Sequence, residues 1–212
     1  MDLADFKKKP LLGILRGVEA EIIEPLIETV IFAGLKTLEI TMNTADAPEL
    51  IYQAKKVCAN RLTLGAGTVL TMQDLKSALG SGASFILLPV LIREVVEYCV
   101  KNRIPVFPGA LTPGEIYQAH DAGASMVKVF PAKFFGPEYF RQIKGPFNKI
   151  ELLACGGVTH ENLKNYFVSG ASGVTFGASI FRKDWLAAKD FKAIGQAIKN
   201  FIDAWERLKE EK

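Results

Sequence analysis

The sequence lacks the features that mark several classes of protein. No apolar run among its 212 residues is long enough to cross a membrane as a helix. The charged segment 1–10 also lacks the apolar centre of a signal peptide. Only three cysteines are present, Cys58, Cys99 and Cys155, and their odd number and spacing indicate neither disulfides nor metal ligands. We therefore expect a cytoplasmic protein with reduced thiols and no membrane partner.

Strong net charge and histidine clusters are absent as well. The formal net charge is only +3, from 26 basic and 23 acidic side chains, and it is scattered along the chain. A nucleic-acid partner is therefore not expected. His120 and His160 stand alone, without the further ligands that would predict a metal site. The ordinary composition and the length predict one globular domain over residues 1–212.

The sequence does contain a regular alternation of short apolar runs with helical patterns. Runs rich in Val, Ile, Leu and Phe without strict alternation are typical of strands in a parallel sheet covered on both faces. They predict strands at residues 11–16, 37–42, 62–67, 85–89, 105–110, 126–131, 150–156 and 173–179. Residues 185–209 predict one long final helix. Eight successive βα units predict an α/β fold, the (β/α)8 TIM barrel, with a doubly wound open sheet as the alternative.

An internal repeat favours the barrel. Four glycines each end a helix and precede an even-numbered strand, where a left-handed C-cap is expected; they are Gly34, Gly82, Gly123 and Gly170. The repeating unit is therefore βαβα, taken four times. Alternate strands of such a barrel supply the four side chains of each interior layer. The residues five positions beyond each glycine predict one such layer, made of Glu39, Leu87, Lys128 and Thr175.

Lys128 lies in the middle of an apolar run. An ammonium group in a dry interior is poorly solvated, so its neutral and nucleophilic form is favoured. Buried lysines of this kind form Schiff bases with carbonyl compounds. The alternative is a lysine whose head reaches water at the end of a strand. Glu39 favours the functional interpretation, because the repeat places it in the same layer on the opposite side of the barrel.

The C-terminal ends of the strands carry the active sites of these barrels. The side chains at those ends that we expect to bind substrate are Arg16, Thr41, Asn43, Thr68, Pro89 and Phe130. Glycine-rich ends follow the last two strands, at Gly156, Gly157, Gly177, Ala178 and Ser179. Backbone N–H groups of such loops often bind a phosphate, although the glycines can also serve the turns alone. Residues 65–67 lack the third glycine of a dinucleotide fingerprint, so NAD is not expected.

These motifs together resemble those of a known family. In chain order they are Gly13-Ile14-Leu15-Arg16, Leu38-Glu39-Ile40-Thr41, Gly65-Ala66-Gly67-Thr68-Val69-Leu70, Pro108-Gly109, Lys128-Val129-Phe130-Pro131-Ala132, Gly156-Gly157-Val158 and Gly177-Ala178-Ser179. Over nearly its whole length the chain resembles the 2-keto-3-deoxy-6-phosphogluconate (KDPG) aldolases and their 6-phosphogalactonate relatives. These are class I aldolases of the Entner–Doudoroff type.

The resemblance implies a homotrimeric barrel that needs no metal or other cofactor. Its expected reaction is the cleavage of a phosphorylated 2-keto acid to pyruvate and glyceraldehyde 3-phosphate. By resemblance, Lys128 is the Schiff-base lysine and Glu39 is the acid/base. Thr68 would help to bind the pyruvyl carboxylate, while Pro89 and Phe130 would line the pocket. The phosphate would lie against the two glycine-rich loops.

Two departures from the family pattern leave the preferred sugar epimer open. Many phosphogluconate aldolases carry an arginine on strand 2 where this chain has Asn43, and a threonine where it has Cys155. Here Arg16 ends strand 1, and strand alternation turns it inward if Ile14 lies in the core. Its planar fork can bind a carboxylate. Arg16, Asn43 and the segment 135–137 look closer to the phosphogalactonate branch.

Three other functions stay open at this point. The same chemistry would serve a 4-hydroxy-2-oxoglutarate aldolase. A phosphate-binding isomerase or decarboxylase would use Lys128 only for its charge, and it would form no covalent adduct with pyruvate. A sugar-phosphate sensor would bind its ligand without turnover and would have no need of the Glu39–Lys128 pair.

Overall fold

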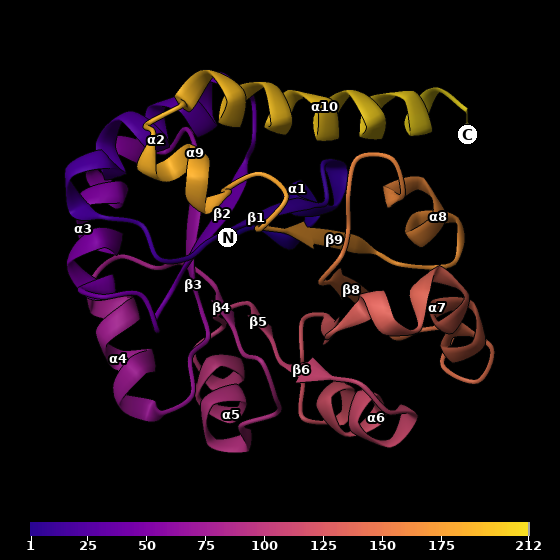
Figure 1. The fold of residues 1–212 in the computed structure, drawn as a ribbon. Helices are drawn as coiled ribbons and strands as arrows, with labels where there is room; N and C mark the ends of the chain where they lie inside the picture. Colours follow the sequence, from indigo (N-terminus) through magenta and orange to yellow (C-terminus); the bar gives the residue numbers. More distant parts are fainter. Residues whose placement is uncertain (212) are drawn as a thin grey trace.

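The computed structural model describes residues 1–211 and shows a parallel barrel surrounded by helices (Figure 1). Its strands are β1 Leu11–Leu15, β2 Thr37–Thr41, β3 Thr63–Gly67, β4 Ile86–Leu87, β5 Val106–Phe107, β6 Gly109–Ala110, β7 Val127–Val129, β8 Leu152–Cys155 and β9 Gly173–Phe176. The helices are α1 Leu3–Lys8, α2 Ala20–Phe32, α3 Ala47–Cys58, α4 Met72–Gly80, α5 Arg93–Lys101, α6 Pro113–Asp121, α7 Gly136–Lys144, α8 Leu163–Val168, α9 Lys183–Ala187 and α10 Phe191–Glu210. A 3-10 turn, η1, covers Ala132–Phe134.

The strand order confirms the predicted barrel and excludes the doubly wound sheet. Neighbouring strands follow the chain, in the order β5-β4-β3-β2-β1-β9-β8-β7-β6, and every pair is parallel. The two ends of this order, β5 and β6, are the halves of the predicted fifth strand. Pro108 separates them, because proline has no N–H for the ladder. β5 pairs with β4 and β6 pairs with β7, so the chain itself closes the barrel at Pro108.

The repeated glycines have the conformation that the sequence predicts. Gly34, Gly82, Gly123 and Gly170 have φ values of 92°, 104°, 95° and 102°, in the left-handed region that disfavours other residues. Capping boxes at Thr71 and Thr112 start α4 and α6. The repeated stop signal thus ends the helix before each even-numbered predicted strand at a left-handed glycine, which keeps these four strands in the same register.

The predicted single helix over residues 185–209 is wrong. The chain forms α9 and α10 with a break between them, where Lys189 has φ 53°. The Asp190 side chain accepts a hydrogen bond from the Ala193 N–H at 2.9 Å and caps α10. An aspartate whose side chain binds a free N–H of the first turn starts a new helix here. The apolar pattern of the sequence continues across this position and gave no sign of the break. The break leaves α9 beside the C-terminal end of β9.

The segment 1–10 forms a helix, α1, that the sequence did not predict. Its Phe6 side chain is buried and meets Phe107 inside the barrel, with 6.3 Å between the ring centroids. The same apolar cluster contains Leu12, Phe85, Leu87, Phe107, Met126 and Leu153. Burial of one such side chain contributes about 2 kcal/mol. α1 therefore closes the N-terminal end of the barrel.

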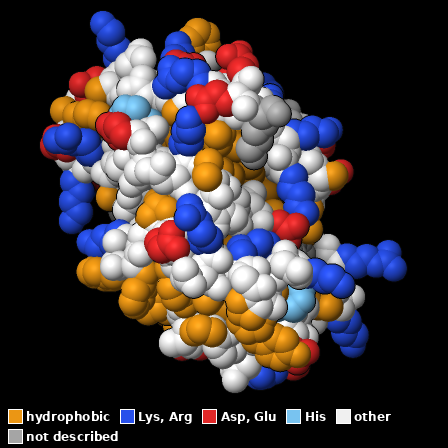
Figure 2. All heavy atoms as spheres, turned by 90° about the vertical axis from the view of Figure 1, so that its right-hand side faces the viewer, with side chains coloured by type: hydrophobic (Ala, Val, Ile, Leu, Met, Phe, Trp, Pro, Cys, Tyr) orange, Lys and Arg blue, Asp and Glu red, His pale blue; other side chains and the backbone are white. Residues whose placement is uncertain are grey.

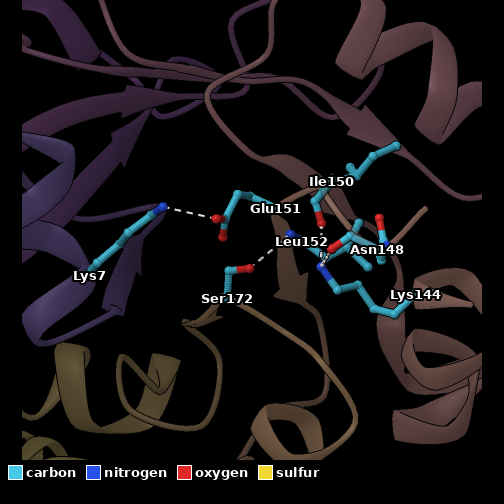
Figure 3. A network of polar contacts seen from close by, with 7 residues as sticks. All are labelled: Lys7, Lys144, Asn148, Ile150, Glu151, Leu152 and Ser172. Carbon is cyan, nitrogen blue, oxygen red and sulfur yellow. Dashed lines mark hydrogen bonds and ion pairs between the residues drawn. The ribbon is translucent and has the colours of Figure 1, made fainter.

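A polar network secures α1 at that end (Figure 3). Lys7 donates to Glu151, just before β8, with 2.9 Å between Nζ and Oε1. Ser172 accepts from the Leu152 N–H, and Lys144 donates to the carbonyl oxygens of Asn148 and Ile150. The ion pair is half-exposed and contributes at most about 1 kcal/mol. Its role is to place α1 over the barrel end rather than to supply much stability.

Candidate active site

Lys128 and Glu39 lie on opposite sides of the barrel interior, as the repeat predicts. β7 and β2 are four strands apart in the barrel, and the two residues are only 5 % and 1 % exposed. A Cβ on Gly67 would lie 2.4 Å from Glu39 Cδ, so this glycine makes room for the carboxylate. Within the part of the chain that the structure describes, the two charged groups form no direct ion pair. Lys128 Nζ and the Glu39 carboxylate oxygens are therefore more than 4.0 Å apart.

Electrostatics in this layer favour proton exchange by Glu39. Burial raises the pKa of the Glu39 carboxyl, and the positive charges of Lys128 and Arg16 partly oppose that rise. A carboxyl with a raised pKa both takes and returns protons more readily near neutral pH. Burial also raises the pKa of the neighbouring Cys155 thiol. Cys155 is therefore protonated and does not compete with Lys128 as a nucleophile.

A cleft of about 950 Å³ opens above Lys128 at the C-terminal ends of the strands. Eleven of the thirteen predicted site residues line it: Arg16, Asn43, Thr68, Pro89, Lys128, Phe130, Gly156, Gly157, Gly177, Ala178 and Ser179. The Phe130 ring centroid lies 5.5 Å from Lys128 Nζ. Glu39 is one of the two that do not line the cleft, because its side chain is almost completely buried. The structure therefore brings the predicted residues to one place.

Thr41 is the other predicted residue that does not line the cleft. Its side chain is fully buried, and its hydroxyl shares a 3.1 Å hydrogen bond with the Thr44 hydroxyl. Thr44 in turn accepts from the Gly17 N–H at 3.1 Å. The pair connects the end of β2 to the loop after β1. Thr41 thus supports the loop beside Arg16 from below.

Arg16 and Thr68 meet at one end of the cleft. Arg16 Nη2 donates to Thr68 Oγ1 at 3.4 Å, which joins the ends of β1 and β3. Thr68 has φ 55°, a left-handed conformation that a β-branched residue adopts only at a free-energy cost. Within residues 1–211 Arg16 has no carboxylate partner. Its guanidinium is therefore free to bind an anionic group of a ligand.

The glycine-rich loops form the other end of the cleft. Gly156 and Gly157 have φ values of 95° and 79°, and a Cβ on Gly157 would lie 2.4 Å from Lys133 Cβ. The N–H groups of Ala178 and Ser179 make no backbone hydrogen bond in the described part of the chain. Free N–H groups in such turns bind anions. The left-handed turn and an anion site therefore coincide here.

Several residues that line the cleft escaped the sequence analysis. Lys183 and Lys189 reach it from the ends of α9, beside the glycine-rich loops. Neither has an ion-pair partner among residues 1–211, so they add positive charge at that end. Thr175 and Cys155 lie in its floor. The layer count had marked Thr175, whereas nothing in the sequence placed the two lysines. Lys189 lies inside the stretch predicted as one helix, and Lys183 lies just before it.

A barrel with a buried lysine below an anion-binding cleft defines a lyase of the Schiff-base aldolase class. A family model described as "KDPG and KHG aldolase" matches residues 4–197. The chain therefore belongs to the KDPG and KHG aldolase family.

Individual relatives agree with this assignment. The chain is 31% identical over 199 residues to the 2-dehydro-3-deoxy-6-phosphogalactonate aldolase of Escherichia coli strain K12, covering 93% of this chain and 95% of that one. A solved structure described as native KDPGal has 30% identity and a TM-score of 0.89, covering 96% and 97% of the two chains. The KDPG aldolase of Legionella pneumophila, solved with pyruvate captured as a covalent carbinolamine, has 25% identity and a TM-score of 0.85, covering 92% and 95%.

Proposed function

We propose that the protein cleaves 2-keto-3-deoxy-6-phosphogluconate or its galactonate epimer to pyruvate and glyceraldehyde 3-phosphate. The observation that carries this proposal is the pair of buried charged residues, Lys128 and Glu39, facing each other below a cleft with an anion site at each end. The family, with members described for both epimers, supports the same reaction.

Lys128 supplies the nucleophile. Its neutral amine attacks the C2 ketone of the keto acid, and loss of water gives a protonated imine. This cation withdraws electrons from the C3–C4 bond.

Glu39 carries the protons. A carboxylate at this position takes the proton of the C4 hydroxyl, directly or through a water, as the C3–C4 bond breaks. Glyceraldehyde 3-phosphate leaves, and an enamine stays on Lys128. Protonation of its C3 atom and hydrolysis of the imine then release pyruvate. One buried acid/base with a raised pKa suits both directions of transfer.

The two ends of the cleft orient the substrate. We assign the pyruvyl carboxylate to Arg16 and Thr68, with Asn43 as a neutral donor, because these side chains line the same cleft as Lys128 and Arg16 has no carboxylate partner in residues 1–211. The phosphate is assigned to Gly156, Gly157, Gly177, Ala178 and Ser179, with the two lysines of α9 adding positive charge. Pro89 and Phe130 pack against the carbon chain. A direct substrate contact of Thr41 stays a prediction.

The proposed function is tested by comparing three substrates in a pyruvate-release assay. Both phosphorylated epimers and the unphosphorylated 4-hydroxy-2-oxoglutarate are supplied at equal concentration. We expect kcat/KM for the better epimer to exceed that for 4-hydroxy-2-oxoglutarate, because only the phosphorylated acids reach the glycine-rich loops. Faster cleavage of 4-hydroxy-2-oxoglutarate would make that compound the main substrate. No pyruvate from any of the three would contradict aldolase function.

Arg16→Leu tests the carboxylate end of the cleft. We expect it to weaken pyruvate binding and the cleavage of every 2-keto acid alike by about 10- to 100-fold, as for a lost hydrogen bond to a charged group. Arg16→Lys should restore part of the loss, since it keeps the charge but lacks the fork. Because Arg16 lowers the pKa of Glu39, its removal should also move the acid limb of the pH profile to higher pH.

Pyruvate affinity is measured by competition, and the rate of borohydride trapping provides a second readout. Arg207→Leu, on the exposed side of α10, is the matched control and should change neither quantity. If Arg16→Leu binds pyruvate as tightly as the parent, then Thr68 and backbone donors hold the carboxylate instead.

We also propose a homotrimer of one-domain chains in the cytoplasm. Large apolar side chains are exposed near the ends of β4 and β7, among them Val90, Phe130, Phe134 and Phe135. Figure 2 shows apolar side chains gathered toward the lower end of one face, at the level where Figure 1 places α6. Such patches are typical of subunit contacts.

The three cysteines are free and buried, as in a reducing compartment. In residues 1–211 no helix has the length and apolar character to cross a membrane.

A further inference from the structure

The interior layer that holds Lys128 and Glu39 has a third polar member, Thr175. Its side chain is fully buried on β9, and its hydroxyl oxygen has no hydrogen-bond partner of normal geometry. The Cys155 thiol beside it on β8 is only a weak donor and acceptor. Among residues 1–211 only three buried side-chain polar atoms lack a partner, and two of them are Thr175 Oγ1 and Glu39 Oε2. Unsatisfied polar atoms thus concentrate in the layer where the reaction is expected.

The strand order places Thr175 between the two reacting side chains. β9 is two strands from β2 and two strands from β7, so Thr175 lies midway between Glu39 and Lys128 around the barrel. Its neighbours across the ladder are Leu12 on β1 and Cys155 on β8. Thr175 and Lys128 both line the floor of the cleft. The layer therefore has a polar half, formed by Lys128, Thr175 and Glu39, and an apolar side formed by Leu87.

A buried hydroxyl without a partner is unfavourable, whereas a valine of the same shape would lose nothing at this position. The hydroxyl is therefore best explained by a polar group that enters the layer with the ligand. The group that comes closest to Lys128 in the reaction is the oxygen on C2 of the keto acid, because the amine bonds to that carbon.

We propose that Thr175 is a positioning residue that binds this C2 oxygen between Lys128 and Glu39 while the imine forms. This inference rests on the proposed Schiff-base function. In the first step the Lys128 lone pair forms the N–C2 bond, and the carbonyl π electrons move to oxygen. That oxygen takes the proton of the Glu39 carboxyl, and the resulting carboxylate takes one proton from the nitrogen. In the second step Glu39 returns its proton, the C2–O bond breaks, and the nitrogen lone pair forms the C=N bond as water leaves.

Thr175 undergoes no net change in either step. Its hydroxyl holds the oxygen in line with the Glu39 carboxyl, first as an alkoxide or hydroxyl and then as the departing water. The same water, kept at this place, is suited to carry the C4 hydroxyl proton to Glu39 during cleavage. The hydroxyl of Thr175 should therefore matter most for imine formation and least for the initial binding of the keto acid.

The test compares Thr175→Val, Thr175→Ser and the parent, using pyruvate as the probe. The rate of borohydride trapping measures imine formation, and competition measures binding before the chemical step. We expect Thr175→Val to slow trapping by about 10- to 100-fold with pyruvate binding unchanged. Thr175→Ser keeps the hydroxyl and should stay within about threefold of the parent. Thr37→Val removes another buried threonine hydroxyl, on β2, and is the matched control.

The outcomes separate this inference from the proposed function. If the parent forms no adduct with pyruvate, the Schiff-base function itself fails. If the parent is trapped on Lys128 and Thr175→Val is trapped as fast, only the role of Thr175 fails. If borohydride trapping is slowed equally in Thr37→Val, the slowing reflects a general loss of barrel packing, and the proposed role of Thr175 also fails. If Thr175→Val does not fold, Thr175→Ala replaces it. The proposal is then contradicted if Thr175→Ser is trapped by borohydride no faster than Thr175→Ala.

Discussion

Lys128→Arg is expected to lose cleavage activity by about 10⁴-fold or more, because it removes the group that forms the covalent intermediate. The guanidinium keeps its proton at all accessible pH values and cannot attack a ketone. It also keeps the positive charge opposite Glu39, so the barrel interior is not left with an unpaired anion. A loss of activity in a folded variant would therefore report the chemistry of the amine rather than its charge.

The decisive measurement is reduction with borohydride in the presence of pyruvate. The parent should gain one adduct, which peptide mapping locates on Lys128, whereas Lys128→Arg should gain none. Lys76→Arg, on the exposed side of α4, controls for the substitution itself and should trap normally. An adduct on another lysine of the parent would refute the assignment. A parent protein that neither gains an adduct nor releases pyruvate from the keto acids would favour the isomerase or decarboxylase alternative.

Glu39→Gln is expected to form the imine with pyruvate but to cleave the phosphorylated substrate about 10²- to 10⁴-fold more slowly. The amide matches the carboxylate in size and fits the space that Gly67 leaves open. It cannot accept the C4 hydroxyl proton. Some change in the rate of imine formation is also expected, because Glu39 exchanges protons there too.

The pH profile gives an independent check on Glu39. Burial raises the pKa of this carboxyl, so the parent should lose activity on acidification at a higher pH than an ordinary glutamate would cause. The residual activity of Glu39→Gln should lack this acid limb. Glu151→Gln, at the closed end of the barrel, is the control and should keep the acid limb of the pH profile and a near-normal kcat. Near-normal turnover by Glu39→Gln would exclude this residue as the proton carrier.

The barrel and its reacting layer could be predicted from sequence because both follow from a repeat. Glycines at Gly34, Gly82, Gly123 and Gly170 set the register of four strands, so a count of five residues places Glu39 opposite Lys128. Strand alternation then turns every second side chain inward. The same count placed Thr175 in the layer, but only the structure shows that its hydroxyl has no partner.

The features that the sequence did not predict depend on contacts between distant segments. Half of the six residues of α1 are charged, and the helix buries one phenylalanine in the barrel end. The break between α9 and α10 depends on Asp190, whose side chain caps the start of α10. The sequence did not predict this break because the apolar pattern continues through residue 190. Lys183 begins α9 and Lys189 follows it, and both line the cleft. Their position could not be read from local spacing.

In residues 1–211, Phe6 and the apolar cluster around it fill the N-terminal end of the barrel, so the cleft at the opposite end is the route to Lys128. On the proposed mechanism the pyruvate fragment is bonded to Lys128 at the bottom of this cleft, while the phosphorylated fragment lies at the rim. The two products must then depart in a fixed order, glyceraldehyde 3-phosphate first and pyruvate last. In the synthetic direction the order reverses, so that pyruvate must enter before the aldehyde can occupy the rim.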